Sequence, residues 1–291
     1  MDVQAELAVS MDDVLDRLLV VPDDPRRRLY EAMRHAMIGG GKRLRPLLVR
    51  ASCDLFAIDS RLSLRVGAAV EAVHAYSLIH DDLPCMDDDD VRRGKPTVHR
   101  AFDEATAILA GDSLHALAFD WLADTATHPD AAIRLALVQA LAQAAGPIGM
   151  AGGQMMDLEA EKNNFSLDVV TRLQELKTGA LISFSVEAGA IMAGVGASDR
   201  MLLRQYARDI GLAFQIVDDI LDVEGDESLT GKALQKDAAA GKETFVSLMG
   251  LGEAKEEARR LVDHALAQLI AFGEEAALLR AIARYVVERD H

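Results

Sequence analysis

Apolar residues recur at intervals of three and four along almost the whole chain, the spacing that gathers them on one face of an α-helix. Alternating apolar and polar runs flanked by turn dipeptides, which would indicate β-strands, are not found in the sequence. The pattern predicts an all-α fold, a single domain over residues 1–291 built as a bundle of about ten or more long helices around a central cavity. We expect helices at residues 7–20, 25–37, 44–56, 60–82, 105–123, 131–145, 169–193 and 198–223, with others after Glu243 and Glu253 and from Glu275.

Capping residues, glycines and prolines mark several of the expected helix ends. Asp24 can cap the second helix, with Pro25 at its first position, and Gly39–Gly41 end it. Ser198 can cap the long helix over residues 198–223. Pro84 ends the helix over residues 60–82, because proline cannot continue a helix.

The composition agrees with this fold and limits the cellular compartment and the classes of partner that we expect. Hydrophobic residues make up 50% of the 291 residues, aromatic residues only 4%, and the net charge of −16 argues against a nucleic-acid partner. Cys53 and Cys85 form no disulfide framework or metal-type spacing. The acidic N-terminus is unlike a secretory signal, and the most apolar window, residues 179–196, is interrupted by Glu187 and glycines. We therefore expect a cytoplasmic protein with no membrane span.

The segment His80–Arg93 concentrates acidic side chains in front of two basic ones. Carboxylates this close repel one another and raise one another's pKa, a cost that a divalent cation removes. Mg²⁺ prefers oxygen ligands and binds carboxylates together with substrate phosphates, while guanidinium groups bind phosphate oxygens in pairs. A solvated acidic turn is the alternative interpretation of such a run by itself. The residues are Asp81, Asp82, Asp87, Asp88, Asp89, Asp90, Arg92 and Arg93.

A second acidic cluster lies in the predicted helix 198–223. Asp218, Asp219 and Asp222 stand among apolar residues of the segment Phe214–Asp222, which leaves little room for an exposed helix face. Like charges four residues apart destabilise a helix, and a cation between them offsets this cost. Two such clusters on two long helices suggest facing sides of one metal-filled pocket.

Basic side chains are scarce, and they gather in islands that suit anions. The first island opens the predicted helix 44–56, where backbone N–H groups also favour anions, although its sequence is not a Walker A loop. Lys177 lies in an otherwise apolar helix and needs an anionic partner. His74 shares a helical stripe with Asp81, and a core histidine is the alternative interpretation. The islands are Lys42–Arg45, Arg92–Lys95, and Lys232 with Lys236 and Lys242.

Together these segments resemble the trans-isoprenyl diphosphate synthases, most closely the bacterial farnesyl diphosphate synthases, over nearly the whole chain. Residues 80–93 are similar to the first aspartate-rich motif of that family, in its longer bacterial form, and residues 214–222 to the second. Residues 41–46 are similar to its Gly-Lys-x-x-Arg-Pro site for isopentenyl diphosphate. The resemblance implies one polyprenyl synthetase domain over residues 1–291, a homodimer, and intact motifs.

The resemblance also implies a role for each matched residue. Asp81 and Asp87 would hold two Mg²⁺ ions and Asp218 a third, all bridging the allylic diphosphate. Auxiliary carboxylates would be Asp82, Asp219 and Asp222. The allylic diphosphate would be bound by Arg92, Lys177 and Lys232, and isopentenyl diphosphate by Lys42, Arg45, His74 and Arg93. Beside the reacting carbons, cationic charge would be stabilised by Thr178 and Gln215.

The implied reaction is head-to-tail prenyl transfer to (2E,6E)-farnesyl diphosphate. The allylic C–O bond of dimethylallyl or geranyl diphosphate ionises with help from Mg²⁺ and basic side chains. The double bond of isopentenyl diphosphate attacks the carbocation, and the departing diphosphate takes the proton. A closed helical bundle excludes the water that would quench the cation.

Product length is expected to depend on the helix that carries the first motif. Tyr76 lies five residues before Asp81, roughly 7–8 Å along the axis, and the resemblance implies that an aromatic ring there stops the chain at C15. Tyr76 and Ser77 are therefore the candidate chain-length gate, with ordinary core packing of Tyr76 as the alternative. Small Ala75 and Ser77 would instead let the chain reach C20, geranylgeranyl diphosphate.

Two further functions compete with this one. A class I terpene cyclase also uses aspartate-rich metal sites, but it has no second diphosphate for residues 41–46 to hold. A non-catalytic, cation-binding helical protein leaves the three basic islands unexplained.

Overall fold

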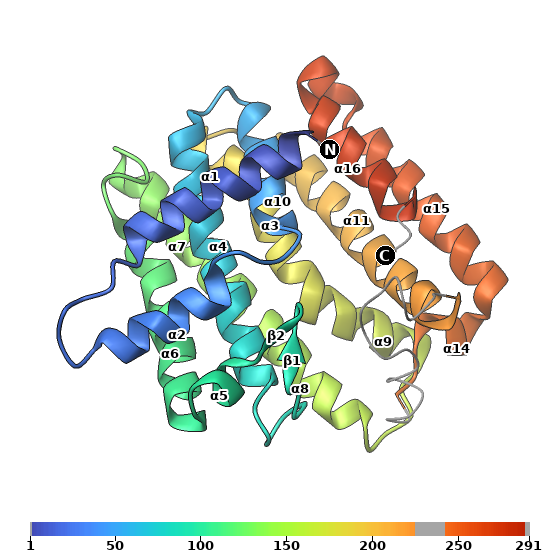
Figure 1. Ribbon diagram of the computed structural model, residues 1–291. Helices are drawn as coiled ribbons and strands as arrows, with labels where there is room; N and C mark the ends of the chain where they lie inside the picture. Colours follow the sequence, from blue (N-terminus) through green and yellow to red (C-terminus); the bar gives the residue numbers. More distant parts are fainter. Residues whose placement is uncertain (1, 225–241, 289–291) are drawn as a thin grey trace.

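The computed structural model describes residues 2–224 and 242–288 and confirms the predicted all-α class (Figure 1). Most of the expected helices lie within a few residues of their predicted positions. The helices are α1 (Asp2–Leu18), α2 (Arg27–Met37), α3 (Leu44–Asp54), α4 (Ser60–Asp81), α5 (Val98–Ala101), α6 (Glu104–Ala123), α7 (Ala131–Ala145), α8 (Met150–Ala160), α9 (Leu167–Gln174), η1 (Glu175–Gly179), α10 (Ala180–Met192), α11 (Ala197–Glu224), α14 (Phe245–Met249), α15 (Leu251–Gln268), η2 (Ile270–Ala276) and α16 (Ala277–Glu288).

Two apolar cores share the helices α3 and α10. The first core surrounds α4 and takes residues from α1, α2, α6 and α7, while the second surrounds α11 and takes residues from α15 and α16. Successive residues of α3 and α10 point into different cores: Leu48 and Ile182 into the second, Val49 and Leu181 into the first. Each core buries an apolar helix face, and this burial is the main favourable term in folding.

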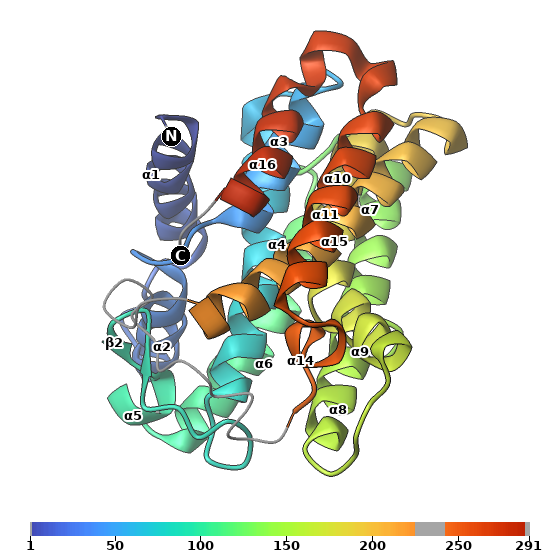
Figure 2. The same ribbon diagram turned by 90° about the vertical axis from the view of Figure 1, so that its right-hand side faces the viewer.

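The same arrangement aligns the two helices that end in aspartate-rich segments. Helices α4 and α11 both run from the upper part of the view toward its lower half (Figures 1 and 2), and α10 packs against both of them. Their C-terminal ends, which carry Asp81 and Asp218, therefore lie toward the same end of the bundle.

A short hairpin corrects the expectation that strands are absent. Strand β1 (Val91–Arg92) pairs antiparallel with β2 (Lys95–Pro96), with Val91 opposite Pro96. The two connecting residues, Arg93 and Gly94, both have positive φ (53° and 74°), as in a type I′ turn. Two-residue strands are too short to show the alternation by which a strand is recognised in sequence.

Several helix boundaries also differ from expectation. Helix α2 begins at Arg27, because Asp24 accepts a hydrogen bond from the Arg26 N–H (2.9 Å) in a turn before the helix. Helix α11 begins at Ala197, so Ser198 lies inside it and is not its cap. The helices α5 and α8 were not predicted. The expected helix 169–193 is divided into α9 and α10 by the π-helical turn η1.

The two most apolar stretches of the chain differ in how far they are buried. The window 179–196, singled out by its composition, forms α10, in which every residue from Leu181 to Met192 except Ser183 is buried. Among the described residues, the stretch Ala131–Ala160 has the length and hydropathy of a membrane-spanning helix, and only 17% of its most apolar window is buried. The structure divides this stretch into α7 and α8, each shorter than the ~20 residues that a membrane span requires.

Candidate active site

The first acidic segment begins where α4 ends. Asp81 is the last residue of α4, and the backbone N–H of Asp87 donates to its carbonyl oxygen (2.8 Å), so the turn brings the two carboxylates together. Burial raises the pKa of Asp81 to about 6, and the charge of Asp87 adds to this shift while Lys177 opposes it. A buried carboxylate beside other carboxylates fits a cation-binding site, because a bound cation removes the cost of ionisation.

Asp82 is held by a guanidinium group from the hairpin. Arg92 Nε donates to one carboxylate oxygen of Asp82 (2.7 Å), and Arg92 Nη2 lies 2.6 Å from the same oxygen and 3.6 Å from Asp89. Asp82 is only 3% exposed. The hairpin thus places a cationic side chain at the edge of the carboxylate cluster.

The second acidic segment lies in the last turns of α11. Asp218, Asp219 and Asp222 are all half-buried there. Asp219 accepts a hydrogen bond from the backbone N–H of Phe245 (2.7 Å), which ties α11 to the start of α14. Gln215 lies one turn earlier and donates to the side chain of Gln174 (3.0 Å), at the end of α9.

Helix α8 supplies a carboxylate that the sequence analysis missed, that of Asp157. Asp157 Oδ2 accepts from Lys177 Nζ (2.7 Å) and from Lys242 Nζ (3.0 Å), so one carboxylate oxygen holds two ammonium groups. The two lysines lower the pKa of Asp157 against the effect of burial. Two signals in the sequence pointed to an anionic partner such as Asp157. Lys177, in an apolar helix, was expected to need an anion, and Lys242 belonged to a basic island.

Close packing brings α8 to η1. A Cβ atom on Gly153 would lie 2.2 Å from the backbone nitrogen of Lys177, so only glycine allows this approach. The next residue, Gln154, has a buried Nε2 with no hydrogen-bond partner among residues 2–224 and 242–288. Thr178, which follows Lys177 in the π-helical turn, is half-buried. The approach thus brings the unpartnered Gln154 and the half-buried Thr178 to the segment that carries Lys177, the residue whose charge lowers the pKa of Asp81.

A separate cationic region lies between the start of α3 and the hairpin. The guanidinium group of Arg93 covers Gly41, where a Cβ atom would lie 2.5 Å from Arg93 Nη1 and where φ is +85°. The Nε of Arg45 is buried and has no hydrogen-bond partner in the described part of the chain. Burial and the charges of Arg45 and Arg93 hold the pKa of His74 well below its usual range, so this imidazole is neutral.

Arg43 has a structural role within the same loop. Its backbone is left-handed (φ 50°), and its buried side chain donates to Glu71 (2.8 Å), to Asp12 (2.8 Å) and to the carbonyl of Met37 (2.5 Å). These contacts fix the loop that presents Lys42, which is exposed.

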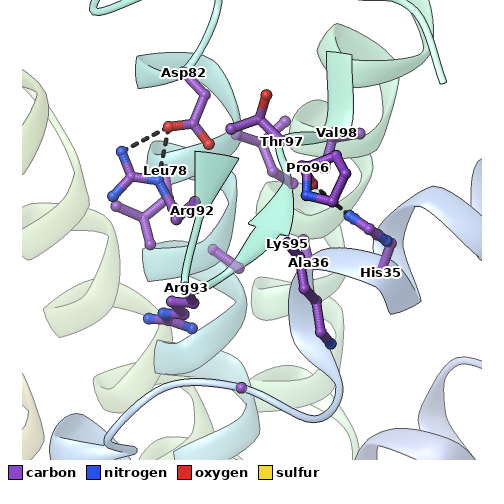
Figure 3. A pocket seen from close by; sticks show the side chains of 13 residues that line it. His35, Ala36, Leu78, Asp82, Arg92, Arg93, Lys95, Pro96, Thr97 and Val98 are labelled. Atoms are coloured by element: carbon purple, nitrogen blue, oxygen red, sulfur yellow. Dashed lines mark hydrogen bonds and ion pairs between the residues drawn. The ribbon is translucent and has the colours of Figure 1, made fainter. Parts of the chain in front are cut away.

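A cavity of about 50 Å³ lies beside the hairpin, where the two regions adjoin (Figure 3). Arg92 points to Asp82 on one side of it, whereas Arg93 lies at its other end (Figure 3). Its lining residues are His35, Ala36, Gly40, Ala75, Leu78, Ile79, Asp82, Arg92, Arg93, Lys95, Pro96, Thr97 and Val98.

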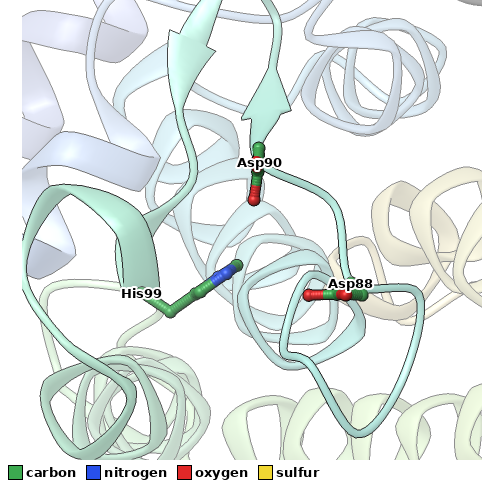
Figure 4. Close-up of side chains that lie close together, drawn as sticks. All are labelled: Asp88, Asp90 and His99. Carbon is green, nitrogen blue, oxygen red and sulfur yellow. The ribbon is translucent and has the colours of Figure 1, made fainter.

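Another cluster of possible metal ligands differs from the predicted set. Ligand atoms of Asp88, Asp90 and His99 lie within 4.8 Å of one another (Figure 4). Asp90 is already paired with Arg100, and His99 Nδ1 lies 3.2 Å from Thr97 Oγ1. These contacts join the acidic turn to α5, and we assign the cluster a structural role.

The candidate chain-length gate lies on α4. The ring of Tyr76 makes edge-to-face contacts with His80 and His115. Ser77 Oγ donates to the carbonyl oxygen of His74 (2.9 Å), on its own helix. Of the predicted site residues, Lys232 lies outside the described residues.

Comparisons with known proteins agree with the fold and with the family resemblance. Residues 26–283 match the polyprenyl synthetase family, and the chain belongs to this family. It is 47% identical over 268 residues to the farnesyl diphosphate synthase of Escherichia coli (strain K12), covering 90% of this chain and 89% of that one. The resemblance to the bacterial farnesyl diphosphate synthases is thereby confirmed.

Solved structures extend the likeness to three dimensions. A crystal structure of an FPP/GFPP synthase from Zymomonas mobilis, without ligand, has a TM-score of 0.91 and 55% identity and covers 98% of each chain. A geranyltransferase from Helicobacter pylori, complexed with magnesium and isoprenyl diphosphate, has a TM-score of 0.84 and 31% identity. The match covers 99% of this chain and 96% of the Helicobacter chain.

Proposed function

We propose that the protein is a Mg²⁺-dependent prenyltransferase that condenses isopentenyl diphosphate with dimethylallyl and then geranyl diphosphate to give farnesyl diphosphate. One observation carries this proposal. The hairpin sends Arg92 to a carboxylate-rich site and the neighbouring Arg93 to an arginine-rich site. Prenyl transfer needs two different diphosphate sites, one with a metal for the leaving diphosphate and one without a metal for the acceptor.

The donor site is built from carboxylates and ammonium groups. We assign Asp81, Asp87 and Asp218 as metal ligands, with three ions per site, because burial and the charge of Asp87 both raise the pKa of Asp81, a cost that a bound cation removes. Bound Mg²⁺ supplies electrostatic stabilisation of the negative charge that develops on the leaving diphosphate. Asp82, Asp219 and Asp222 would support the ligands, as Asp82 already positions Arg92.

Basic side chains complete the donor site. Arg92 and Lys177 would bind the allylic diphosphate, and Lys232 is proposed by resemblance alone. We add Lys242, because its ammonium group lies 3.0 Å from the same Asp157 oxygen that Lys177 contacts at 2.7 Å. Asp157 would keep the two ammonium groups together until the diphosphate arrives.

The acceptor site would bind the diphosphate of isopentenyl diphosphate. The unpartnered Nε of Arg45 and the guanidinium group of Arg93 supply charge-assisted hydrogen bonds, with Lys42 at the entrance. His74 is neutral here and can donate a hydrogen bond without adding charge. Among the described residues, the cluster Asp81–Asp90 lies on the donor side of the hairpin, so the acceptor diphosphate is bound but would not be activated as a leaving group.

The reaction needs no protein nucleophile. The allylic C–O bond breaks, the double bond of isopentenyl diphosphate forms the new C–C bond, and the adjacent carbon loses a proton to the released diphosphate. The Thr178 hydroxyl and the Gln215 side chain lie beside Lys177 and Gln174 and are proposed to stabilise positive charge on carbon. Tyr76 and Ser77 would limit the product to C15.

The test is incubation with isopentenyl diphosphate, Mg²⁺ and either dimethylallyl or geranyl diphosphate, with product length read by mass spectrometry. Farnesyl diphosphate is expected from both primers. A C20 product would support the geranylgeranyl alternative, and cyclic hydrocarbon from geranyl diphosphate alone would support a terpene cyclase. Mg²⁺ binding without turnover of any primer would overturn the proposal in favour of a non-catalytic protein.

We also propose a cytoplasmic homodimer that associates through α6 and α7. These helices pack together and leave Ile108 (46%), Leu109 (56%) and Leu135 (67%) exposed, with Ile148 (68%) just beyond α7. Large exposed apolar side chains gathered on two packed helices are typical of association surfaces. Light scattering after gel filtration should give a dimer, and Leu135→Asp should give a monomer, whereas Ile270→Asp, at an exposed site elsewhere, should stay dimeric. A monomeric parent protein would overturn this assignment.

A further inference from the structure

Three possible metal ligands, Asp88, Asp90 and His99, lie together outside the proposed Mg²⁺ centre. Asp88 and Asp90 belong to the acidic turn between α4 and β1, and His99 belongs to α5. Their ligand atoms lie within 4.8 Å of one another, and no hydrogen bond joins these three described side chains. The imidazole points toward the space between the two carboxylates (Figure 4). Two carboxylates grouped with an imidazole are ligands that suit a divalent cation.

The imidazole of His99 is buried and one of its nitrogens has no partner. His99 is only 7% exposed, and its Nε2 has no hydrogen-bond partner among the described residues. The Thr97 hydroxyl donates its single proton to the carbonyl oxygen of Asp90 (3.3 Å), so Thr97 Oγ1 accepts from His99 Nδ1, which lies 3.2 Å away. The proton of the neutral imidazole is then on Nδ1, and Nε2 carries a lone pair. A bound metal ion satisfies such a lone pair, and a hydrogen bond from the other ring nitrogen is typical of a metal-binding histidine.

The carboxylates of Asp88 and Asp90 keep oxygens for a cation. Asp90 Oδ1 is paired with Arg100 Nε, which leaves Asp90 Oδ2. Both aspartates are exposed, so a cation can reach them from the solvent. The guanidinium group of Arg100 offsets one of the two carboxylate charges, and one negative charge remains to attract the cation.

We infer that Asp88, Asp90 and His99 bind a divalent transition-metal cation such as Zn²⁺, at a site that shares no residue with the proposed Mg²⁺ centre. An imidazole ligand favours Zn²⁺ over Mg²⁺, which prefers oxygen ligands. Metal–ligand bonds of about 2.0–2.2 Å hold ligand atoms roughly 3–4 Å apart, so small rotations of the exposed carboxylates complete the set, with water in the remaining position. The role of the cation is structural, because it cross-links the acidic turn that carries Asp87 to α5.

Titration calorimetry with Zn²⁺ tests this site in the full chain, after EDTA treatment and gel filtration and with an excess of Mg²⁺ present. The parent protein is expected to bind Zn²⁺ at a site from which excess Mg²⁺ does not displace it. His99→Gln removes one ligand and should weaken this binding at least about 100-fold, since changes behind the ligands already cost about 10–100-fold. His264→Gln is the matched control and should bind Zn²⁺ as the parent does. Its imidazole is 2.7 Å from the Asp209 carboxylate, but it belongs to no three-ligand cluster among the described residues.

Asp88→Asn keeps the test decisive if the His99 variant unfolds. Asp88 is exposed and has a left-handed backbone (φ 49°), which asparagine also adopts, so this variant should fold. It should bind Zn²⁺ at least about tenfold more weakly and lose most of the rise in Tm that Zn²⁺ gives the parent protein. No tight Zn²⁺ binding by the parent, or equal binding by the parent and Asp88→Asn, would overturn the inference. Neither result depends on prenyl turnover, so this inference and the proposed function can fail separately.

Discussion

Replacing Asp81 by asparagine should stabilise the ligand-free protein while abolishing its turnover. The pKa of Asp81 is raised from 3.8 to about 6 by burial and by nearby carboxylates. Each pKa unit is worth about 1.4 kcal/mol, so ionised Asp81 costs the folded protein about 3 kcal/mol at neutral pH. Asp81→Asn has almost the same shape but carries no charge, so it avoids this cost.

The sign of the effect follows from proton binding. The folded protein holds the Asp81 proton to a higher pH than the unfolded chain does, so the contribution of this group to stability is fully present below about pH 4. That contribution is lost as the pH rises to about 6 and is constant above it. The advantage of Asp81→Asn should therefore grow between about pH 4 and pH 6 and then level off.

Urea-induced unfolding followed by circular dichroism, with EDTA present, measures this difference. Asp263→Asn, on the exposed face of α15, is the control and should change the free energy of unfolding by less than about 0.5 kcal/mol. Adding Mg²⁺ with a diphosphate should stabilise the parent protein but not Asp81→Asn. The reasoning is refuted if Asp81→Asn has equal or lower stability than the parent protein at pH 8 without metal.

Three further predictions test other parts of the site. Arg45→Ala should raise the KM for isopentenyl diphosphate about 10–100-fold with a smaller change in kcat. Steady-state kinetics at saturating allylic substrate would measure both constants, and an unchanged KM would exclude Arg45 from the acceptor site. Gly153→Ala should lower the free energy of unfolding by about 1–3 kcal/mol, because its methyl group would meet the Lys177 backbone, whereas Gly252→Ala, with open space around it, should not. Chelation by EDTA should abolish turnover reversibly. Titration calorimetry should find weaker Mg²⁺ binding as the pH falls through about 6, where Asp81 becomes protonated. Binding that does not change with pH would contradict the assignment of Asp81 as a metal ligand.

Local patterns in the sequence predicted most of the long helices and the position of the first acidic segment on them. Helix α4 follows from its apolar spacing and the proline after it, which place Asp81 at its end. The anionic partner that Lys177 was expected to need is Asp157. An ammonium group in an apolar helix is stable only if an anion or hydrogen-bond acceptor lies beside it.

Contacts between distant segments could not be predicted in the same way. Nothing local distinguishes Asp157 from other acidic residues until α8 packs against η1 and places it beside Lys177 and Lys242. The π-helical turn likewise interrupts a stretch whose spacing is helical throughout. The hairpin escaped prediction because its pairing is set by two turn residues and not by an apolar pattern.

The hairpin also bears on how one active site could add more than one isoprene unit. After each condensation the new allylic chain carries the diphosphate that entered with the acceptor, on the Arg93 side of the hairpin. To act as donor in the next round, that diphosphate has to transfer to the Arg92 side. The two arginines are consecutive residues of one hairpin, and their guanidinium groups lie toward opposite ends of one small cavity, so the two sites adjoin. The exchange between rounds would then be a short transfer within the protein.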